Sequence, residues 1–469
     1  MKILLVRPGV PAGLNAVLEG VFPLGPMYLA SYLLKQRPQD EVRILDCLVD
    51  GLSPADVHRE AESFQPDILG ISAMSVQAPL AHEIAALIKK SGTDTSVIIG
   101  GPHATAAPTQ ILRDSNIDAV ALGEGEATFL DVVKTVESHR SLTSVPGLML
   151  RGESGEIVTT PPREPIGDLD ALPYPAWDLA GIEKFFTYRL MTPNNIRASE
   201  RCATVFTSRA CPYRCIYCHN IFGKRFRARS PSSVLDEMKI LYERYGVREF
   251  HITDDCFNLE IDRAREIMNG IIKSGWDIKI AFPNGIRADR LPDDLLETMK
   301  RAGVYKMNFG IESGSKRIQE LIRKNLDLDV VTDAINRADR MGFITHGFFM
   351  IGFPTETRDE ILQTIEMACS SRLTMAGFFF VTPYPGTALY DMAISQGWRP
   401  LDITGDEGCY TDVGVNLSAV PDDDLKRLHR HAYRRFYLNP LRISRLAWRM
   451  PRKKDLWDVF LAHWKVKFV

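Results

Sequence analysis

Short apolar runs alternate with amphipathic stretches along the first part of the chain. The runs are rich in Val, Ile and Leu and show no alternation of polar and apolar positions, as is typical of strands buried on both faces of a sheet. We expect strands at Lys2–Val6, Val42–Asp46, Ile68–Ser72, Ser96–Gly100 and Ala119–Leu122. Helical spacing of apolar residues fills the intervals, at 26–36, 53–64, 77–91 and 126–137. This alternation predicts a doubly wound parallel sheet.

A Pro-rich stretch then interrupts the alternation. Residues 151–202 contain two proline clusters, around Pro161 and Pro173, and we interpret the stretch as an ordered linker. From about residue 203 the alternation restarts, and we expect strands at Ala203–Ser208, Glu249–Thr253, Lys279–Pro283, Tyr305–Gly310, Phe343–Ile351 and Gly377–Thr382. Six such units with right-handed crossovers predict a partial (β/α)6 barrel.

The fold class is therefore α/β, with a different region at the C-terminal end. We expect a doubly wound domain at 1–145, a Pro-rich linker at 146–202, a partial barrel at 203–390 and a mainly helical, basic region at 391–469. From residue 425 onward Lys and Arg far outnumber Asp, Glu is absent, and three of the six tryptophans occur: Trp448, Trp457 and Trp464. This region has three interpretations, in order of preference: a solvated helical face covering the barrel, a surface for anionic lipid or membrane, and a nucleic-acid surface.

Composition narrows the picture only a little. The chain has 469 residues, of which 45% are hydrophobic and 25% charged, with a net charge of −2, so nothing global indicates nucleic-acid or membrane binding. The N-terminal apolar run is too short for a signal peptide, and no run is long enough to span a bilayer. Eight cysteines are too few for a disulfide scaffold, and we expect a reducing, cytoplasmic setting.

Three cysteines crowd one loop after the first barrel strand, while Cys47, Cys202, Cys256, Cys369 and Cys409 are scattered. Three thiolates in one loop can bind three irons of a cubane cluster and leave the fourth iron open to a ligand. Loops after barrel strands form the face where barrel active sites lie. One alternative is a zinc site with His219 as fourth ligand, but four ligands within nine residues are cramped for the usual separated pairs. A second alternative is that the cysteines are simply packed, buried thiols. The crowded cysteines are Cys211, Cys215 and Cys218.

The C-x3-C-x2-C spacing, with Tyr217 before the third cysteine, resembles the radical S-adenosylmethionine superfamily. That resemblance implies a [4Fe–4S] cluster held by Cys211, Cys215 and Cys218. It further implies that S-adenosylmethionine binds the open iron and is cleaved to a 5′-deoxyadenosyl radical. The partial barrel of that superfamily agrees with the six units expected here.

Polar and glycine-rich loops end several barrel strands and are candidates for binding S-adenosylmethionine. Asp254 or Asp255 suits its ammonium group, Arg287 suits its carboxylate through a bidentate contact, and Glu312 suits its ribose hydroxyls. Glycines allow the backbone to approach the adenosine closely. Taken singly, each polar residue is equally explained as a helix cap or ion-pair partner, and no catalytic residue is assigned. The candidates are Asp254, Asp255, Asn284, Arg287, Gly310, Glu312, Ser313 and Gly352.

Two glycine-rich segments, 100–103 and 123–125, end the fourth and fifth strands of the first sheet. Ligands of parallel sheets bind at this carboxyl edge, although the dinucleotide motif G-x-G-x-x-G is missing after the first strand. Together with the segments 22–33, 66–72 and 172–178, they resemble the cobalamin-binding branch of the same superfamily. The resemblance covers roughly residues 1–390.

This second resemblance implies a cobalamin site on the first domain. The cobalt-ligand motif D-x-H-x-x-G is not found, so no axial histidine is named, and we expect that His103 does not bind cobalt. A domain that binds nothing is the alternative. The implied cobalamin contacts are Ser72, Met74, Gly100, Gly101, Pro102, His103, Gly123, Glu124 and Gly125.

Together these cofactors predict cobalamin-dependent methylation of an unactivated carbon in a small molecule or lipid. One alternative is oxidative cyclisation or rearrangement without methyl transfer, as in the anaerobic cyclases. Another is a non-enzymatic module that binds a metal or corrinoid. Expected partners are the substrate and a reducing electron donor such as flavodoxin or ferredoxin, with peripheral membrane contact through the basic C-terminal region as a further option and no nucleic acid.

Overall fold

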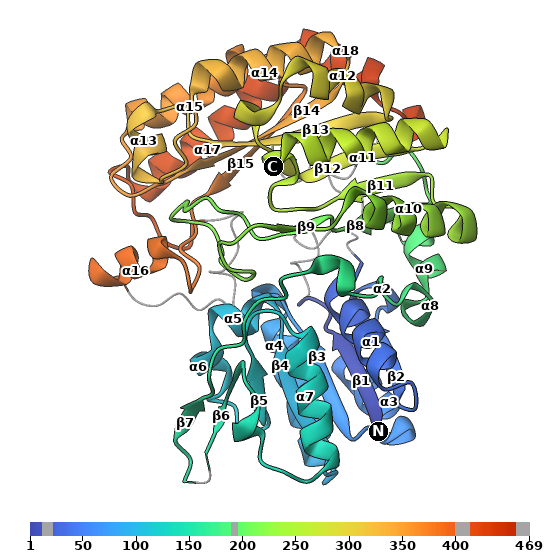
Figure 1. Ribbon diagram of the computed structural model, residues 1–469. Helices are drawn as coiled ribbons and strands as arrows, with labels where there is room; N and C mark the ends of the chain where they lie inside the picture. Colours follow the sequence, from blue (N-terminus) through green and yellow to red (C-terminus); the bar gives the residue numbers. More distant parts are fainter. Residues whose placement is uncertain (12–21, 153, 189–195, 399–412, 456–469) are drawn as a thin grey trace.

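A computed structural model of the chain describes residues 1–11, 22–152, 154–188, 196–398 and 413–455 (Figure 1). In the first domain five parallel strands are arranged in the order β2-β1-β3-β4-β5. Their bounds are β1 Lys2–Arg7, β2 Glu41–Asp46, β3 Ile68–Ser72, β4 Ser96–Gly100 and β5 Ala119–Ala121. The predicted doubly wound sheet is confirmed, and its order reverses between β1 and β3, where such folds bind ligands.

Helices cover both faces of this sheet because its strands are apolar on both sides. On β1, Ile3 and Leu5 pack toward α1 and α7, whereas Leu4 and Val6 pack toward α3 and α4. Ser53 begins α3 with a reciprocal capping box to Asp56, which satisfies backbone donors at the helix start. The helices are α1 Leu24–Gln36, α2 Cys47–Asp50, α3 Pro54–Phe64, α4 Ala78–Lys90, α5 Pro102–Ala106, α6 Pro108–Ile111 and α7 Glu126–Glu137.

The stretch expected to be a Pro-rich linker differs in its first part. Strands β6 Leu148–Arg151 and β7 Ile157–Thr159 form an antiparallel hairpin that extends the first sheet beyond β5. Buried and half-buried positions alternate along β6, a pattern that the neighbouring prolines obscured. The remaining segment contains the short helices α8 Trp177–Ala180 and α9 Ile182–Thr187, and packs Trp177 edge-on against Phe22 at 5.2 Å.

The second sheet has six strands, all parallel, in the order β15-β14-β13-β12-β11-β8. These strands are β8 Cys202–Val205, β11 Glu249–Ile252, β12 Lys279–Ile286, β13 Val304–Glu312, β14 Ile344–Ile351 and β15 Met375–Phe380. The order follows the chain, as the predicted partial barrel requires. Figure 1 shows its helices on the outer side of the strands: α10 Pro231–Tyr245, α11 Ile261–Ser274, α12 Asp293–Arg301, α13 Lys316–Leu321, α14 Leu328–Arg340 and α15 Arg358–Ser370.

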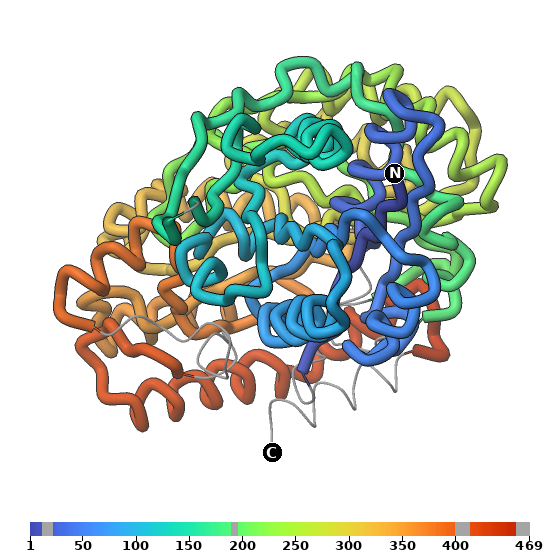
Figure 2. The backbone as a smooth tube through the Cα atoms, turned by 90° about the horizontal axis from the view of Figure 1, so that it is seen from below, coloured from blue at the N-terminus to red at the C-terminus, as the bar shows by residue number. Residues whose placement is uncertain are grey.

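Beyond the barrel the described residues form helices joined by loops; the α-helices are α16 Ala388–Ser395, α17 Asp422–Tyr437 and α18 Pro440–Arg449. α17 packs on β15, where the Tyr433 hydroxyl bonds the backbone of Phe378 and the Tyr437 hydroxyl bonds that of Ala376. Viewed from below, these helices run along one margin of the molecule (Figure 2). Trp457 and Trp464 lie outside the described residues. No described helix is both long and apolar enough to cross a membrane.

Candidate active site

The three loop cysteines follow the two-residue strand β9 Ser208–Arg209, beyond the carboxyl end of β8, and all are free and half-buried. Backbone bonds hold the loop at Ile216, whose N–H donates to Ile322 at 3.1 Å and whose carbonyl accepts from Leu389 at 2.9 Å. The loop is thus fastened between α13 and α16. Its ligand candidates are Cys211, Cys215 and Cys218.

A fourth thiol adjoins this loop. Cys256, buried after β11, forms a hydrogen bond with Cys211 that lowers the pKa of Cys211 to about 6. The same bond raises the pKa of Cys256, so Cys256 is the donor. Burial raises the pKa of Cys215, and raises that of Cys218 to about 12. The hydrogen bond from Cys256 therefore favours the thiolate of Cys211, the form in which a cysteine binds metal, whereas burial favours the protonated thiols of Cys215 and Cys218.

The distances between the sulfur atoms of the loop cysteines bear on the alternative of a zinc site. Sulfur atoms around one tetrahedral zinc ion lie about 3.8 Å apart, given Zn–S bonds of about 2.3 Å. Within the described ranges, only Cys202, Glu249 and His251 form a group whose ligand atoms all lie within 4.8 Å of one another. The three loop thiols do not form such a group, so at least two of their sulfur atoms lie more than 4.8 Å apart, which a multi-iron cluster accommodates. His219 is half exposed, with Nε2 3.8 Å from the Asp255 carboxylate.

The compact group of Cys202, Glu249 and His251 lies at the amino ends of β8 and β11. The Glu249 carboxylate accepts two backbone N–H groups from residues 198–199 at 2.7 Å, the Tyr305 hydroxyl at 2.7 Å, and His251 at 2.8 Å. Its oxygens are therefore fully occupied by protein donors. The amino end of a barrel serves stability, and we interpret this group as structural.

Asp254 and Asp255 are the two candidate partners for the ammonium group of S-adenosylmethionine, and the carboxylate of Asp254 already binds protein donors. Its carboxylate is buried and accepts the Thr207 N–H at 2.6 Å, the Ser208 hydroxyl at 2.6 Å and the Thr207 hydroxyl at 2.5 Å. Burial also raises the pKa of Asp254. Asp255 keeps a side-chain exposure of 19% and lies next to the cysteine loop through His219. Asp255 is thus the carboxylate that a ligand can reach.

The loop after β12 is tied to the cysteine loop. The Arg287 guanidinium lies 3.8 Å from the ring centre of Tyr213, which stands within the cysteine loop. Two of its N–H groups donate to Asp289, at 2.8 and 2.6 Å. Asn284, expected in the loop, lies within β12, which continues to Ile286, and donates to the carbonyl of Thr253 at 2.6 Å. Arg287 therefore carries its own counter-ion, which an incoming carboxylate would have to displace.

Glu312 ends β13 and meets a residue that the sequence patterns did not single out. Lys324 binds its carboxylate at 2.7 Å and also donates to the Tyr217 hydroxyl at 3.2 Å. A side chain at Gly310 would collide with this pair, since an added Cβ would lie 2.8 Å from the Lys324 ammonium. Through Lys324, the carboxylate of Glu312 on the barrel rim is linked to the hydroxyl of Tyr217 in the cysteine motif.

The last two rim candidates have structural partners. Ser313 is fully buried and bonds the Thr364 hydroxyl at 3.2 Å. The Gly352 N–H donates to Glu356 at 2.7 Å, and burial raises the pKa of Glu356 to about 8. Glu356 is fully buried, with one oxygen lacking a hydrogen-bond partner among the described residues. The rim therefore includes a carboxyl whose burial favours the protonated form.

The candidate cobalamin edge of the first domain is shaped by glycine. Gly101 has a φ of +91°, and an added Cβ would lie 3.0 Å from the Ser72 hydroxyl and 3.2 Å from the Ala73 backbone. Only glycine fits there, so the β4 turn packs closely on the β3 turn. Gly100 is less confined, with Ala121 at 3.7 Å. At these two positions, therefore, no side chain projects from the edge, which leaves room for a large planar ligand.

The turn after β4 also fixes the position of His103. Pro102 and His103 are the first two residues of α5. His103 is 2% exposed, its Nδ1 lies 3.3 Å from the Ser75 hydroxyl, and burial lowers its pKa to about 4. The imidazole is therefore neutral and held by the protein. Met74, which precedes Ser75 in the chain, is 44% exposed and offers an apolar side chain that a ligand can reach.

The turn after β5 contacts the other domain. Glu124 pairs with Arg227 at 2.6 Å and with Arg209 at 3.6 Å, and Glu126 pairs with Arg209 at 2.5 Å. All four side chains are at most 9% exposed. Arg209 belongs to β9 and Arg227 to its partner β10 Arg227–Ala228, so the pairs flank the cysteine loop on both sides. We call these four residues the interdomain clamp.

Further contacts bring the two carboxyl edges together. An added Cβ at Gly123 would lie 3.8 Å from the carbonyl of Ile221, just beyond the cysteine motif. One at Gly386, after β15, would lie 3.5 Å from Ala106 in α5. Figure 1 shows the first domain placed below the barrel in this manner. The thiols and the glycine edge thus share one interdomain region, and both donor sets suit the cofactors implied for them.

Matches to family models agree with this arrangement. Residues 205–368 match the radical SAM superfamily, and residues 13–133 match the B12 binding domain. Fold and site thus define a radical S-adenosylmethionine enzyme with a second, corrinoid-binding domain. The chain belongs to the cobalamin-dependent radical S-adenosylmethionine enzymes, whose cofactors are a [4Fe–4S] cluster, S-adenosylmethionine and cobalamin.

Alignments with related proteins cover most of the chain. An uncharacterised methyltransferase of Pyrococcus horikoshii is 35% identical over 446 residues, which are 94% of this chain and 93% of the relative. The cytidylyl-2-hydroxyethylphosphonate methyltransferase of Streptomyces wedmorensis is 32% identical, covering 85% and 82%. An anaerobic magnesium-protoporphyrin IX monomethyl ester cyclase of Rubrivivax gelatinosus is 27% identical, covering 83% and 69%.

Solved structures show the same fold. The methyltransferase TsrM of Kitasatospora setae, with cobalamin and a [4Fe–4S] cluster bound, superposes with a TM-score of 0.67 at 19% identity. The superposition covers 84% of this chain and 75% of that chain.

Proposed function

We propose that this enzyme transfers a methyl group to an unactivated carbon of a small molecule or lipid. When bound, the cluster supplies an electron for cleaving S-adenosylmethionine, and cobalamin supplies the methyl group. The observation that carries the proposal is the interdomain clamp, because it holds the glycine edge of the first domain against the cysteine loop. A methyl group and a substrate radical have to meet within one enclosed region.

In this proposal each rim residue has a separate task. Cys211, Cys215 and Cys218 hold the cluster, and Asp255 is the reachable carboxylate for the ammonium of S-adenosylmethionine. Glu312, with Lys324 beside it, orients the ribose hydroxyls. The remaining candidates, whose polar groups already have protein partners, position the loops and do not touch the cofactor.

Substrate class is suggested by the relatives and not by a described pocket. The two methyltransferase relatives reported above are more identical to this chain than the cyclase is, which favours methylation over cyclisation. Phosphonate methylation by the Streptomyces relative makes nucleotide-linked phosphonates a first set of trial substrates. We further propose a reducing compartment, the cytoplasm, and an electron donor of the flavodoxin or ferredoxin kind.

The test is anaerobic reconstitution with iron, sulfide and hydroxocobalamin, followed by S-adenosylmethionine and a reductant. We expect about four irons and about one cobalt per chain, and release of 5′-deoxyadenosine. Cys215→Ala should abolish nucleoside release, whereas Cys369→Ala, a half-buried thiol outside the site, should leave it unchanged. A product heavier by one methylene supports methylation, a product that has lost hydrogens supports cyclisation, and iron without cobalt would refute the two-cofactor mechanism.

A further inference from the structure

The outer side of the C-terminal helices carries an apolar stripe. Leu441 and Trp448 are 74% and 85% exposed, and their spacing of seven residues places them on one side of α18. Leu438, in the turn before α18, is 64% exposed. Ile443, 45% exposed, lies on a different side of α18 and is not part of the stripe. Large apolar residues grouped in this way on a soluble surface mark a binding surface.

Arginines adjoin the stripe in excess over carboxylates. The buried carboxylate of Asp339 accepts from Arg449 at 2.7 Å, from Arg445 at 3.2 Å, and from Arg372. Three guanidinium groups thus share one carboxylate, which leaves a net positive charge. Arg372 keeps 55% of its side chain exposed.

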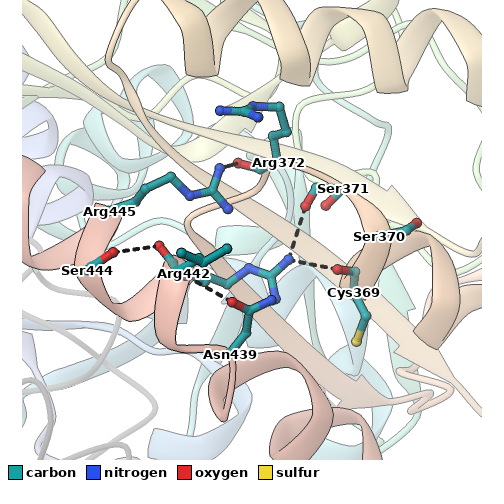
Figure 3. A pocket seen from close by; sticks show the side chains of 9 residues that line it. Cys369, Ser370, Ser371, Arg372, Asn439, Arg442, Ser444 and Arg445 are labelled. Carbon is teal, nitrogen blue, oxygen red and sulfur yellow. Dashed lines mark hydrogen bonds between the residues drawn. The ribbon is translucent and has the colours of Figure 1, made fainter.

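A fourth guanidinium adds to this charge. Arg442 donates to four backbone carbonyls, those of Cys369 at 2.9 Å, Ser371 and Leu373 at 3.0 Å, and Phe436 at 2.8 Å. Within the described part of the chain, no carboxylate pairs with it. A pocket lies between α15 and α18 (Figure 3). It is lined by Arg372, Arg442 and Arg445, together with Ser370, Ser371, Asn439 and Ser444.

We propose that this surface binds an anionic phospholipid bilayer, with a headgroup phosphate in the arginine pocket and the apolar stripe in the membrane interface. Guanidinium groups suit phosphate oxygens, and exposed Trp and Leu beside basic residues are typical of interfacial helices. Because no described helix can span a bilayer, the contact is peripheral.

The location of the surface argues against an electron donor as the occupant. Leu373 precedes β15 and Asp339 precedes β14, so the pocket lies at the amino ends of the barrel strands. The cysteine loop lies at the carboxyl ends. An acidic redox protein docked here would be separated from the cluster by the length of the barrel, whereas a bilayer at this face leaves the active site open to the other side.

The full-length protein can be sedimented with vesicles of phosphatidylcholine alone, or with about 30% phosphatidylglycerol added. We expect binding to the anionic vesicles only, weakened by salt. The double variant Leu441→Ser/Trp448→Ser should weaken binding about tenfold or more. The single variant Arg372→Gln should weaken it about fivefold, as expected for one basic residue at an anionic surface. Matched controls are Val330→Ser, 41% exposed on α14, and Arg244→Gln, 63% exposed on α10; both should bind like the original chain.

Several outcomes would overturn the proposal. They are equal binding to neutral vesicles, no binding to either kind, and unchanged binding by the stripe and pocket variants. Protection of the pocket by inorganic phosphate without vesicle binding would assign it to a free anion. A change in oligomeric state on Leu441→Ser/Trp448→Ser would assign the stripe to a contact between copies. Unchanged circular dichroism and melting temperature of each variant ensure that lost binding is not lost folding.

Discussion

Removing one carboxylate from the interdomain clamp should cost far more stability than its single lost contact suggests. In the clamp two arginines face two glutamates, and no member is more than 9% exposed. Glu126→Gln keeps the shape but leaves Arg209 and Arg227 to share Glu124. One buried positive charge is then unpaired, which costs about 3–5 kcal/mol of the free energy of unfolding. Because the pairs join the two domains, the loss should separate them before either unfolds.

Urea unfolding followed by circular dichroism and limited proteolysis would measure both effects. The matched control is Glu60→Gln, which breaks an exposed pair with Arg43 (37% and 45% exposed) and should cost less than about 1 kcal/mol. Adding Arg209→Met to Glu126→Gln should recover part of the loss, since the unpaired charge disappears. The reasoning is refuted if Glu126→Gln and Glu60→Gln cost the same, or if the double variant is the least stable of all.

Three further predictions concern single titrating groups. Burial raises the pKa of Glu356 to about 8, so the native state binds a proton that the unfolded state releases, and stability should fall as pH rises from about 4.5 to 8. The urea midpoint of Glu356→Gln should not show this dependence on pH. Parallel curves of midpoint against pH for the variant and the original chain would contradict the prediction. Burial lowers the pKa of His103 to about 4, so stability should fall as pH drops from about 6.5 to 4. His103→Gln should flatten that slope yet retain cobalt after reconstitution, and loss of cobalt would make His103 a ligand. In metal-free protein, Cys256→Ala should raise the pKa of Cys211 from about 6 and slow its alkylation by iodoacetamide at neutral pH, unlike Cys369→Ala; equal rates would exclude the hydrogen bond.

Most of the fold could be predicted because burial on both faces leaves a clear pattern. Expected and observed limits coincide for β3 at Ile68–Ser72 and for β4 at Ser96–Gly100, where a serine is the only polar residue in each strand. β6 and β7 were missed because short, half-buried strands beside prolines look like a linker. The two-residue strands β9 and β10 have too few positions to show any pattern.

For the site, the thiols could be found because their spacing is local. The roles of other residues depend on partners distant in sequence: Arg209 and Glu126 are separated by 83 positions, and no pattern near either residue indicates the pair. Asp254 and Asp255 are equivalent as sequence, yet only the structure shows that Asp254 is occupied by Thr207 and Ser208. Lys324 and Glu356 had no distinguishing motif at all.

The clamp also limits how this protein can be recombined. Its two glutamates lie in the first domain and its two arginines lie on either side of the cysteine loop. Each domain alone would therefore carry buried charges without their counter-ions. A chimera that joins this first domain to another barrel inherits buried acids without their bases, unless that barrel supplies both arginines at the same places. The corrinoid domain is therefore not an exchangeable cassette, and successful domain swaps will be those that carry the four charges across the junction as one set.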